Sequence, residues 1–353
     1  MTLFSNLFHR PAAASVLSLI GVLGFYVIFG GVDLEKLFHA ASWMNYAARI
    51  GIVALPVGLL MISGEIDISI GAMIPAGAMT TAIISGHYEL PILYGILGSV
   101  VVGISVGGIN GFLAVRTNVP TLIITLATLV GMQGVVLAGS KLLTGTASVP
   151  LDAPEWARTL FGHLMFGGSH QVIILWWTIF AILFWFVLHK SRYGNWIYAM
   201  GGDKESARNA GIPVNRMTIL LFVLTATSAS FVGVCHAILF NSAQVSGGMN
   251  DIFNIIVSVV VGGVLLSGGF GSVPGIFVGT LTFAIVNKGI DFTTIDRNWS
   301  NLIIGAMLLI AVAMNESFRK FALSAITLRK PPSSKTAPSG RHIGRSPTTM
   351  SNR

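Results

Sequence analysis

Long uncharged stretches are the feature that most constrains how this chain can fold. The sequence contains ten mostly apolar runs of 17 to 26 residues, joined by shorter polar segments. A helix that crosses a bilayer needs about 20 such residues. Only 10% of the residues are charged, whereas a soluble globular protein has roughly 25%. Because so few charges cannot cover a surface that faces water, the sequence predicts a polytopic membrane protein and excludes a soluble enzyme.

The predicted fold class is an all-α polytopic membrane protein with about ten transmembrane helices. The first run follows Arg10, but it is too long for a signal peptide and no small-residue cleavage site ends it, so it is interpreted as a membrane anchor. The third, eighth and ninth runs are interrupted by Pro or Gly, and we expect them to cross only part of the bilayer. The ten predicted spans are residues 12–31, 44–63, 67–85, 91–115, 119–140, 170–189, 215–240, 252–268, 272–289 and 299–315.

Basic residues in the short loops predict the orientation of these spans. Ten spans put both termini on one side, and that side collects fifteen Lys and Arg residues against six on the other. The richer side is therefore predicted to be cytoplasmic, together with both termini. The opposite face carries residues 141–169, which we expect to include a short helix lying on the membrane interface.

The end of the chain differs in composition from the rest. From Arg329 onward it is rich in Pro, Ser, Thr, Lys and Arg and cannot bury apolar surface, so we predict disorder there. Its charge favours contact with anionic membrane lipid and not with nucleic acid. The expected organisation is a transmembrane domain over residues 1–316 and a basic cytoplasmic tail over residues 317–353.

The sequence offers no catalytic constellation. It lacks a G-x-x-x-x-G-K-[ST] phosphate loop, its eight His are scattered, and Cys235 is its single cysteine. We therefore expect no enzymatic activity, no cofactor, no metal and no disulfide in this chain. The glycine-rich segment 268–275 lies between two spans and lacks a preceding strand, so it is interpreted as a tight cytoplasmic turn.

Polar residues inside the spans are candidates for a translocation pathway. Glu65 and Asp67 lie where the third span begins, and an acid inside a membrane is a functional candidate. Asp67 could instead cap the helix that starts near Ser69, and we favour that role. For hydroxyl side chains the alternative is bonding to their own helix. The other candidates are Asn110, Thr121, Thr125, Thr128 and Gln133.

Glycines recur at every fourth position in the fourth span, at Gly103, Gly107 and Gly111. Such a face lets two helix backbones approach closely inside a bilayer. We favour packing within this subunit over contact with a second copy.

The segment 190–216 carries the clearest local signal. Asp203 is a suitable N-cap, Gly211 can end a helix and Pro213 prevents its continuation. The pattern predicts a two-turn helix over residues 204–210, which is too short to be stable by itself in water. Its small residues Ser206, Ala207 and Ala210 suit close contact with a partner protein, and a loop helix resting on its own subunit is an equal alternative.

Three motifs together resemble those of the permease subunits of bacterial ABC importers for ribose, xylose and autoinducers. Residues 63–71, SGEIDISIG, resemble the family motif G-G-I-D-[LI]-S-x-G, although Glu65 stands where the family usually has Gly. Residues 201–212 resemble the cytoplasmic motif G-x-x-x-x-A-A-x-x-x-G-I, and residues 262–275 are similar to a late glycine-rich turn. The likeness runs in the same order over roughly residues 50–315.

The resemblance implies a type II, vitamin-B12-importer-like fold that works as a homodimer or heterodimer in the bacterial inner membrane. The implied partners are a cytoplasmic ABC ATPase that binds ATP and Mg, a periplasmic sugar-binding protein and a second permease subunit. The chain would translocate a sugar or sugar-like solute, with a coupling helix at about residues 203–211. Carried over by position, ATPase coupling falls on Gly202, Glu205, Ala207, Arg208, Gly211 and Ile212.

Two other functions remain compatible with the residues. A secondary carrier or facilitator that acts alone is the main alternative, and a membrane scaffold without transport is another. The scarcity of buried ionisable groups argues against a proton-coupled carrier.

Overall fold

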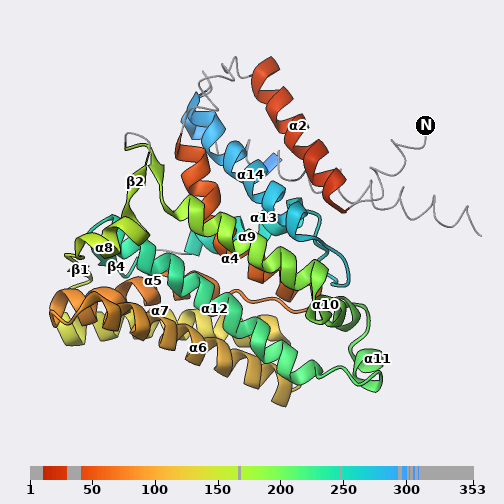
Figure 1. The fold of residues 1–353 in the computed structure, drawn as a ribbon, viewed down its shortest axis with the longest axis horizontal. Helices are drawn as coiled ribbons and strands as arrows, with labels where there is room; N and C mark the ends of the chain where they lie inside the picture. Colours follow the sequence, from red (N-terminus) through yellow and green to blue (C-terminus); the bar gives the residue numbers. More distant parts are fainter. Residues whose placement is uncertain are drawn as a thin grey trace, which may run out of the picture.

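The structure is a computed structural model that describes residues 11–29, 41–165, 168–246, 249–292 and 296–299, together with 302, 305, 306 and 309. These residues form twelve α-helices and four short strands (Figure 1). Five of the helices are long and apolar enough to cross a membrane. They are α4 (Ala41–Ile62), α6 (Ile92–Arg116), α7 (Thr121–Thr144), α9 (Ile173–Lys190) and α12 (Val214–Leu239).

Shorter helices account for most of the remaining predicted spans. They are α2 (Pro11–Phe29), α5 (Ile70–Ala82), which continues as a π-helical turn over Ile83–His87, α13 (Met249–Val261) and α14 (Val273–Gly289). The predicted end of the eighth span at residue 268 is wrong, because α13 stops at Val261 and is followed by glycines with positive φ, 89° at Gly263 and 82° at Gly268. The predicted span 299–315 lies almost entirely outside the described residues, and the predicted tail 317–353 lies wholly outside them.

The fold is mostly helical, so the predicted all-α class is wrong in one detail. Strand β1 (Ser148–Pro150) pairs antiparallel with β4 (Ser242–Gln244), and β2 (Leu164–Met165) pairs with β3 (His170–Gln171). The predicted interfacial helix is only the turn α8 (Glu155–Ala157), followed by a π-helical turn over Arg158–Gly162. Strand pairing between segments about ninety residues apart depends on the tertiary fold, so a local sequence pattern cannot reveal it.

Burial divides the long helices into two groups. Every residue of α4 from Ile50 to Ile62 is buried, and most of α12 is buried as well. In contrast, α6, α7 and α9 expose many Leu, Ile and Val side chains on their outer faces, as expected for helices that face lipid or another subunit. The core of the described chain is therefore α4, α5 and α12, flanked by more exposed helices.

The glycine stripe of α6 packs against α12. A methyl group added at Gly103 would lie 2.7 Å from the Cα of Thr227, and one added at Gly107 would lie 2.5 Å from the carbonyl oxygen of Phe222. The same addition at Gly111 would reach 2.6 Å from the Cα of Ile219. The predicted packing within the subunit is confirmed.

Candidate functional site

Two short helices lie at one end of the bundle, and α8 with the strands lies at the other (Figure 1). They are α10 (Arg192–Gly202), which was not expected from the sequence, and α11 (Lys204–Asn209). Asp203 caps α11, since its carboxylate accepts a hydrogen bond from the Ser206 backbone N–H at 2.6 Å. Hydrogen bonds from Ser206 lower the pKa of the Asp203 carboxyl. Gly211 follows with φ of 81°, so the predicted helix and both of its end signals are confirmed.

The predicted coupling residues do not all face outward from α11. Gly202, Glu205, Arg208 and Gly211 are exposed and Ile212 is half-buried, but Ala207 is only 3% exposed. The expectation that Ala207 faces a partner is therefore wrong, because its side chain belongs to the hydrophobic core of this chain. A helix of this length is stabilised by such packing on its own subunit.

Three glycine segments meet beside these helices. The Gly269 N–H donates a hydrogen bond to the Ile62 carbonyl at 2.8 Å. A methyl group at Gly201 would lie 1.8 Å from that carbonyl oxygen and 2.4 Å from the Gly269 nitrogen, and one at Gly268 would lie 2.9 Å from the Cα of Gly64. We call Gly64, Gly201, Gly268 and Gly269 the glycine junction. It joins the ends of α4 and α10 to the turn between α13 and α14, which are the three segments that carried the sequence resemblance.

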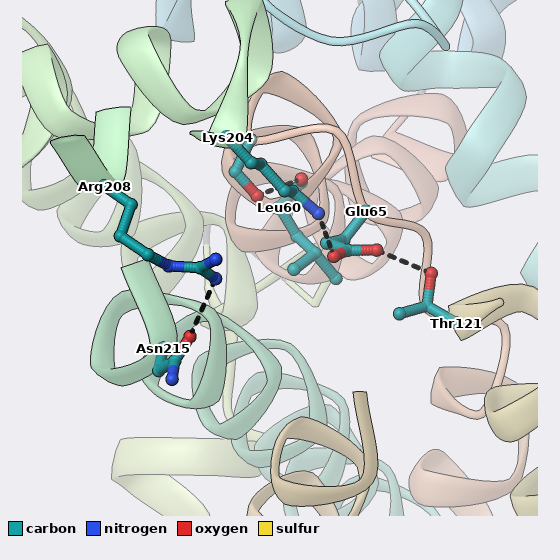
Figure 2. A network of polar contacts seen from close by, with 7 residues as sticks. Leu60, Glu65, Thr121, Lys204, Arg208 and Asn215 are labelled. Carbon is teal, nitrogen blue, oxygen red and sulfur yellow. Dashed lines mark hydrogen bonds and ion pairs between the residues drawn. The ribbon is translucent and has the colours of Figure 1, made fainter. Parts of the chain in front are cut away.

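Glu65 links this junction to two other helices. Figure 2 shows its carboxylate between Lys204, the first residue of α11, and Thr121, the first residue of α7. Lys204 forms an ion pair with Oε1, and the Thr121 hydroxyl donates to Oε2 at 2.7 Å. The Glu65 side chain is 11% exposed and that of Lys204 is 39% exposed. Glu65 therefore ties the connection between α4 and α5 to the start of both helices, and it contacts one other predicted pathway residue, Thr121.

Arg208 provides a second attachment of α11. Its Nη2 donates to the Asn215 Oδ1 at 3.4 Å, which joins α11 to the first turn of α12 (Figure 2). Both residues are exposed, so this contact is weaker than the one at Glu65.

Asp67 lies in a buried hydrogen-bond network. Its Oδ1 accepts from the backbone N–H of Ser69 at 2.9 Å and from the Ser69 hydroxyl at 2.6 Å, and its Oδ2 accepts from Thr225 at 2.6 Å. Asn110 donates to the Ser69 hydroxyl at 2.9 Å, and Thr128 donates to the Asn110 carbonyl at 2.6 Å. The network therefore connects the start of α5 to α6, α7 and α12.

The structure also tests the roles predicted for Asp67, Thr125 and Gln133. Ser69 holds the N-cap position of α5 but makes no capping bond with its side chain. Asp67, two residues earlier, accepts the Ser69 backbone N–H, so the capping bond favoured for Asp67 is present although its position as the N-cap residue is wrong. Thr125 bonds to its own helix, to the Thr121 carbonyl at 2.9 Å, as the alternative for hydroxyl residues stated. Gln133 is half-buried further along α7 and takes no part in the hydrogen bonds of the Asp67 network.

A charged cluster about midway along α4 was not predicted from the sequence. Arg49 on α4 contacts His236 in the last turn of α12 at 3.0 Å and lies 3.8 Å from Asp251 in the first turn of α13. These three residues line a cavity of about 330 Å³. Arg49 lies within the predicted span 44–63 and is one of the six basic residues counted on the side opposite the cytoplasm. The available signal was a charged residue inside an apolar span, which in a membrane protein is a functional candidate.

Comparison with known proteins identifies the family. The sequence model of the family described as "Branched-chain amino acid transport system / permease component" matches residues 39–312. This chain belongs to that family. The matched range contains every residue of the glycine junction, the Glu65 link, the Asp67 network and the Arg49 cluster.

Individual relatives are similar over most of their length. The fructose import permease protein FrcC of Rhizobium meliloti is 30% identical over 338 residues, which cover 91% of each chain. The ribose import permease protein RbsC of Escherichia coli K12 is 28% identical over 270 residues, 75% of this chain and 81% of the relative. The autoinducer 2 import system permease protein LsrD of Photorhabdus luminescens is 30% identical over 263 residues, 74% of this chain and 78% of the relative.

These matches confirm the resemblance and the functional class. The chain is a multi-pass inner-membrane permease subunit of a sugar-type ABC importer, and it is not an enzyme. Membership of the family implies an ABC ATPase and a binding protein as its partners.

Proposed function

We propose that this permease carries a sugar or sugar-like solute, received from a periplasmic binding protein, into the cytoplasm. The similarity to FrcC, RbsC and LsrD, whose names specify fructose, ribose and autoinducer 2, supports this class of solute. ATP and Mg would bind to the separate ATPase, in keeping with the lack of a phosphate loop in this chain. Hydrolysis there would switch a pair of permease subunits between outward-facing and inward-facing states.

The finer architecture belongs to the same proposal. We propose ten membrane helices in a type II, vitamin-B12-importer-like arrangement, a dimer of permease subunits, and a transmembrane domain over residues 1–316 followed by a basic tail. The end that carries α10 and α11 would be cytoplasmic, together with both termini. The excess of Lys and Arg on the predicted cytoplasmic side, fifteen against six, supports this orientation.

The observation that carries the coupling proposal is the Glu65 contact with Lys204. We propose that the ATPase docks on the exposed surface of α11 and the residues that flank it, which are Gly202, Glu205, Ser206, Arg208 and Gly211. Ala207 and Ile212 would instead hold α11 on its own subunit. Because Lys204 pairs with Glu65 and Thr121 bonds to the same carboxylate, a displacement of α11 would move the start of α7.

The Asp67 network would then act as the polar unit that moves with these helices. Asp67, Asn110 and Thr128 are bonded across α5, α6 and α7, so a shift of α7 would be transmitted to the start of α5. Thr125 and Gln133 on α7 would line the path, and Glu65 would lie at its cytoplasmic mouth.

Three matched arginine substitutions test the docking face. Ser206 is exposed on α11, Ala207 is buried on it, and Thr159 is exposed at the opposite end of the molecule. Ser206→Arg should reach the membrane at normal abundance, because exposed substitutions usually cost less than about 0.5 kcal/mol, yet it should co-purify poorly with the ATPase. Ala207→Arg should reduce abundance, since it buries a charge in the core. Thr159→Arg should change neither quantity.

Normal co-purification and normal sugar uptake by Ser206→Arg would contradict the docking proposal. Uphill sugar uptake by the purified chain alone, driven by a proton or sodium gradient in lipid vesicles, would instead favour the stand-alone carrier.

A further inference from the structure

We infer that the cavity beside Arg49 is a binding site for a hydroxyl-rich solute of the monosaccharide class. This inference rests on the proposed sugar-import function and assigns to it a specific place on this chain. The charged lining comes from α4, α12 and α13, through Arg49, His236 and Asp251. Residues 74, 75 and 78 of α5 form an apolar wall, and Phe240, Ser242, Gln244 and Ser246 complete the site.

The Arg49 guanidinium and the Asp251 carboxylate can both form more hydrogen bonds than they make with the described residues. Arg49 Nη1 lies 3.0 Å from His236 Nε2. A guanidinium can only donate, so Nε2 accepts and His236 is neutral with its proton on Nδ1. Arg49 Nη2 lies 3.8 Å from Asp251 Oδ1, which is too long for a hydrogen bond. The buried Arg49 Nε has no hydrogen-bond partner among the described residues. The guanidinium can therefore donate further bonds and the carboxylate can accept them.

A vicinal diol fits this arrangement chemically. Each hydroxyl can accept a hydrogen bond and donate one. One hydroxyl can therefore accept a hydrogen bond from Arg49 while its neighbour donates one to Asp251. The diol would then bridge the 3.8 Å between these two charged side chains. Hydrogen bonds to charged groups are stronger than those between neutral groups. Ser242, Gln244 and Ser246 add neutral groups of the kind that orient a polar ligand.

The surroundings hold Arg49 in position. Its guanidinium lies 5.1 Å from the ring centroid of Tyr46, and the Tyr46 hydroxyl accepts a hydrogen bond from Asn254 at 2.9 Å. The cation–π contact and the hydrogen bond between Asn254 and Tyr46 hold the N–H groups of Arg49 in place before a ligand binds. The cavity volume of about 330 Å³ lies at the lower end of the range for small-molecule sites, which starts near 300 Å³, and exposed Phe240 supplies an apolar ring at its edge.

The location of the cavity suits a solute that arrives from the binding protein. Arg49 precedes Ile62 by thirteen residues along α4, so it lies roughly 20 Å from the glycine junction. It shares the end of the bundle that carries β4, which the proposed orientation makes periplasmic. Helices α4 and α5 lead from this cavity toward the Glu65 link and the Asp67 network. Helix α12 carries both His236 at the cavity and Thr225 in the Asp67 network.

Thiol protection tests the site in the intact transporter with its ATPase. Cys235 is the only cysteine and is buried, so a membrane-impermeant methanethiosulfonate should not modify it. Ser246→Cys places a thiol at the exposed rim of the cavity, and Thr159→Cys places one on an exposed turn outside it. The probes are fructose, ribose and xylose, each added separately. At least one should slow modification of Ser246→Cys twofold or more and leave Thr159→Cys unaffected.

A second variant separates binding from a structural role. Asp251→Asn keeps the shape of the side chain but removes the negative charge, so it should abolish protection of Ser246→Cys at unchanged abundance. If Asp251→Asn lowers abundance yet retains full protection, the cluster is structural and the inference is wrong.

Uptake of the same sugars by the intact system distinguishes the two proposals. If one or more of the sugars are taken up and none of them protects Ser246→Cys, the binding site is overturned and the import function stands. Protection without uptake supports the site and contradicts import of that sugar. If no probe is taken up and none protects, both proposals are wrong for this class of solute.

Discussion

Glu65, just beyond α4, and Arg49, midway along α4, are charged residues in opposite environments. Near the C-terminal end of α4, Glu65 has both carboxylate oxygens bonded, to Lys204 and to Thr121, and the neighbouring backbones touch at the glycine junction. Thirteen residues before the last residue of α4, Arg49 lies 3.8 Å from Asp251 beside a cavity. The first region has its hydrogen bonds completed from within the chain, and the second has them only partly completed.

This difference indicates that the two regions have different functions. A close-packed contact leaves no room for independent movement, so displacement of one segment must displace the other. An incompletely bonded charged cluster in a cavity can instead gain bonds from a ligand. We therefore assign transmission of movement to the glycine junction and Glu65, and recognition of solute to the Arg49 cluster. Three substitutions test this contrast.

The largest effect is expected from Gly201→Ala. Its added methyl group would meet the Ile62 carbonyl oxygen at 1.8 Å and the Gly269 nitrogen at 2.4 Å. Both obstacles are backbone atoms, so α10 must move away, at a cost of about 3 kcal/mol or more in the free energy of unfolding. The amount of folded protein in the membrane should fall sharply.

Gly202→Ala is the matched control, because nothing lies within 4 Å of its added methyl group, and its abundance should be close to normal. Equal abundance of the two variants would show that the junction is not tightly packed.

An intermediate effect is expected from Glu65→Gln. The amide keeps the size of the side chain but loses the ion pair with Lys204, which is partly exposed. We expect near-normal abundance and an approximately fivefold loss of ATP-driven uptake, equivalent to about 1 kcal/mol of coupling. Glu155→Gln, an exposed carboxylate at the opposite end, serves as the control and should be silent.

Exchange of the two charges refines this test. The double variant Glu65→Lys with Lys204→Glu should recover part of the lost uptake, because the ion pair is restored in reverse. If Glu65→Gln alone transports normally, the Glu65 link does not transmit movement.

The smallest effect is expected from Arg158→Gln. Arg158 forms an ion pair with Asp152 at the same end of the molecule as the Arg49 cluster, but both side chains are exposed, 47% and 93%. Exposed pairs contribute about 0–1 kcal/mol, so thermal stability and uptake should remain within experimental error. A strong loss of uptake would show that recognition at this end extends beyond the cavity.

Local signals in the sequence predicted the helices well. Apolar runs located α4, α6, α7, α9 and α12 within four residues of their observed ends, because span length is fixed by the thickness of a bilayer. Asp203 and Gly211 marked the ends of α11 correctly, since capping depends on neighbouring residues only. The end of α13 was missed because apolar residues continue past the glycines that stop the helix.

The residues of the candidate sites were partly predictable. Asp67, Asn110 and Thr128 were chosen as polar residues on apolar spans, and they belong to one network. Thr125 and Gln133 were chosen by the same criterion and lie outside it, since polarity alone does not say which neighbour a side chain meets. Arg49 was missed because its partners His236 and Asp251 lie about 190 and 200 residues away in the sequence.

The sequence by itself determined that this chain spans a membrane, where most of its long helices run and how α11 begins and ends. These properties follow from apolar length and from capping, which act over a few neighbouring residues. Only the tertiary structure decided that Ala207 faces inward, that Glu65 meets Lys204 across 139 positions, and that Arg49 faces a cavity. Such contacts arise from the packing of distant helices, which fixes side-chain partners that no local pattern encodes.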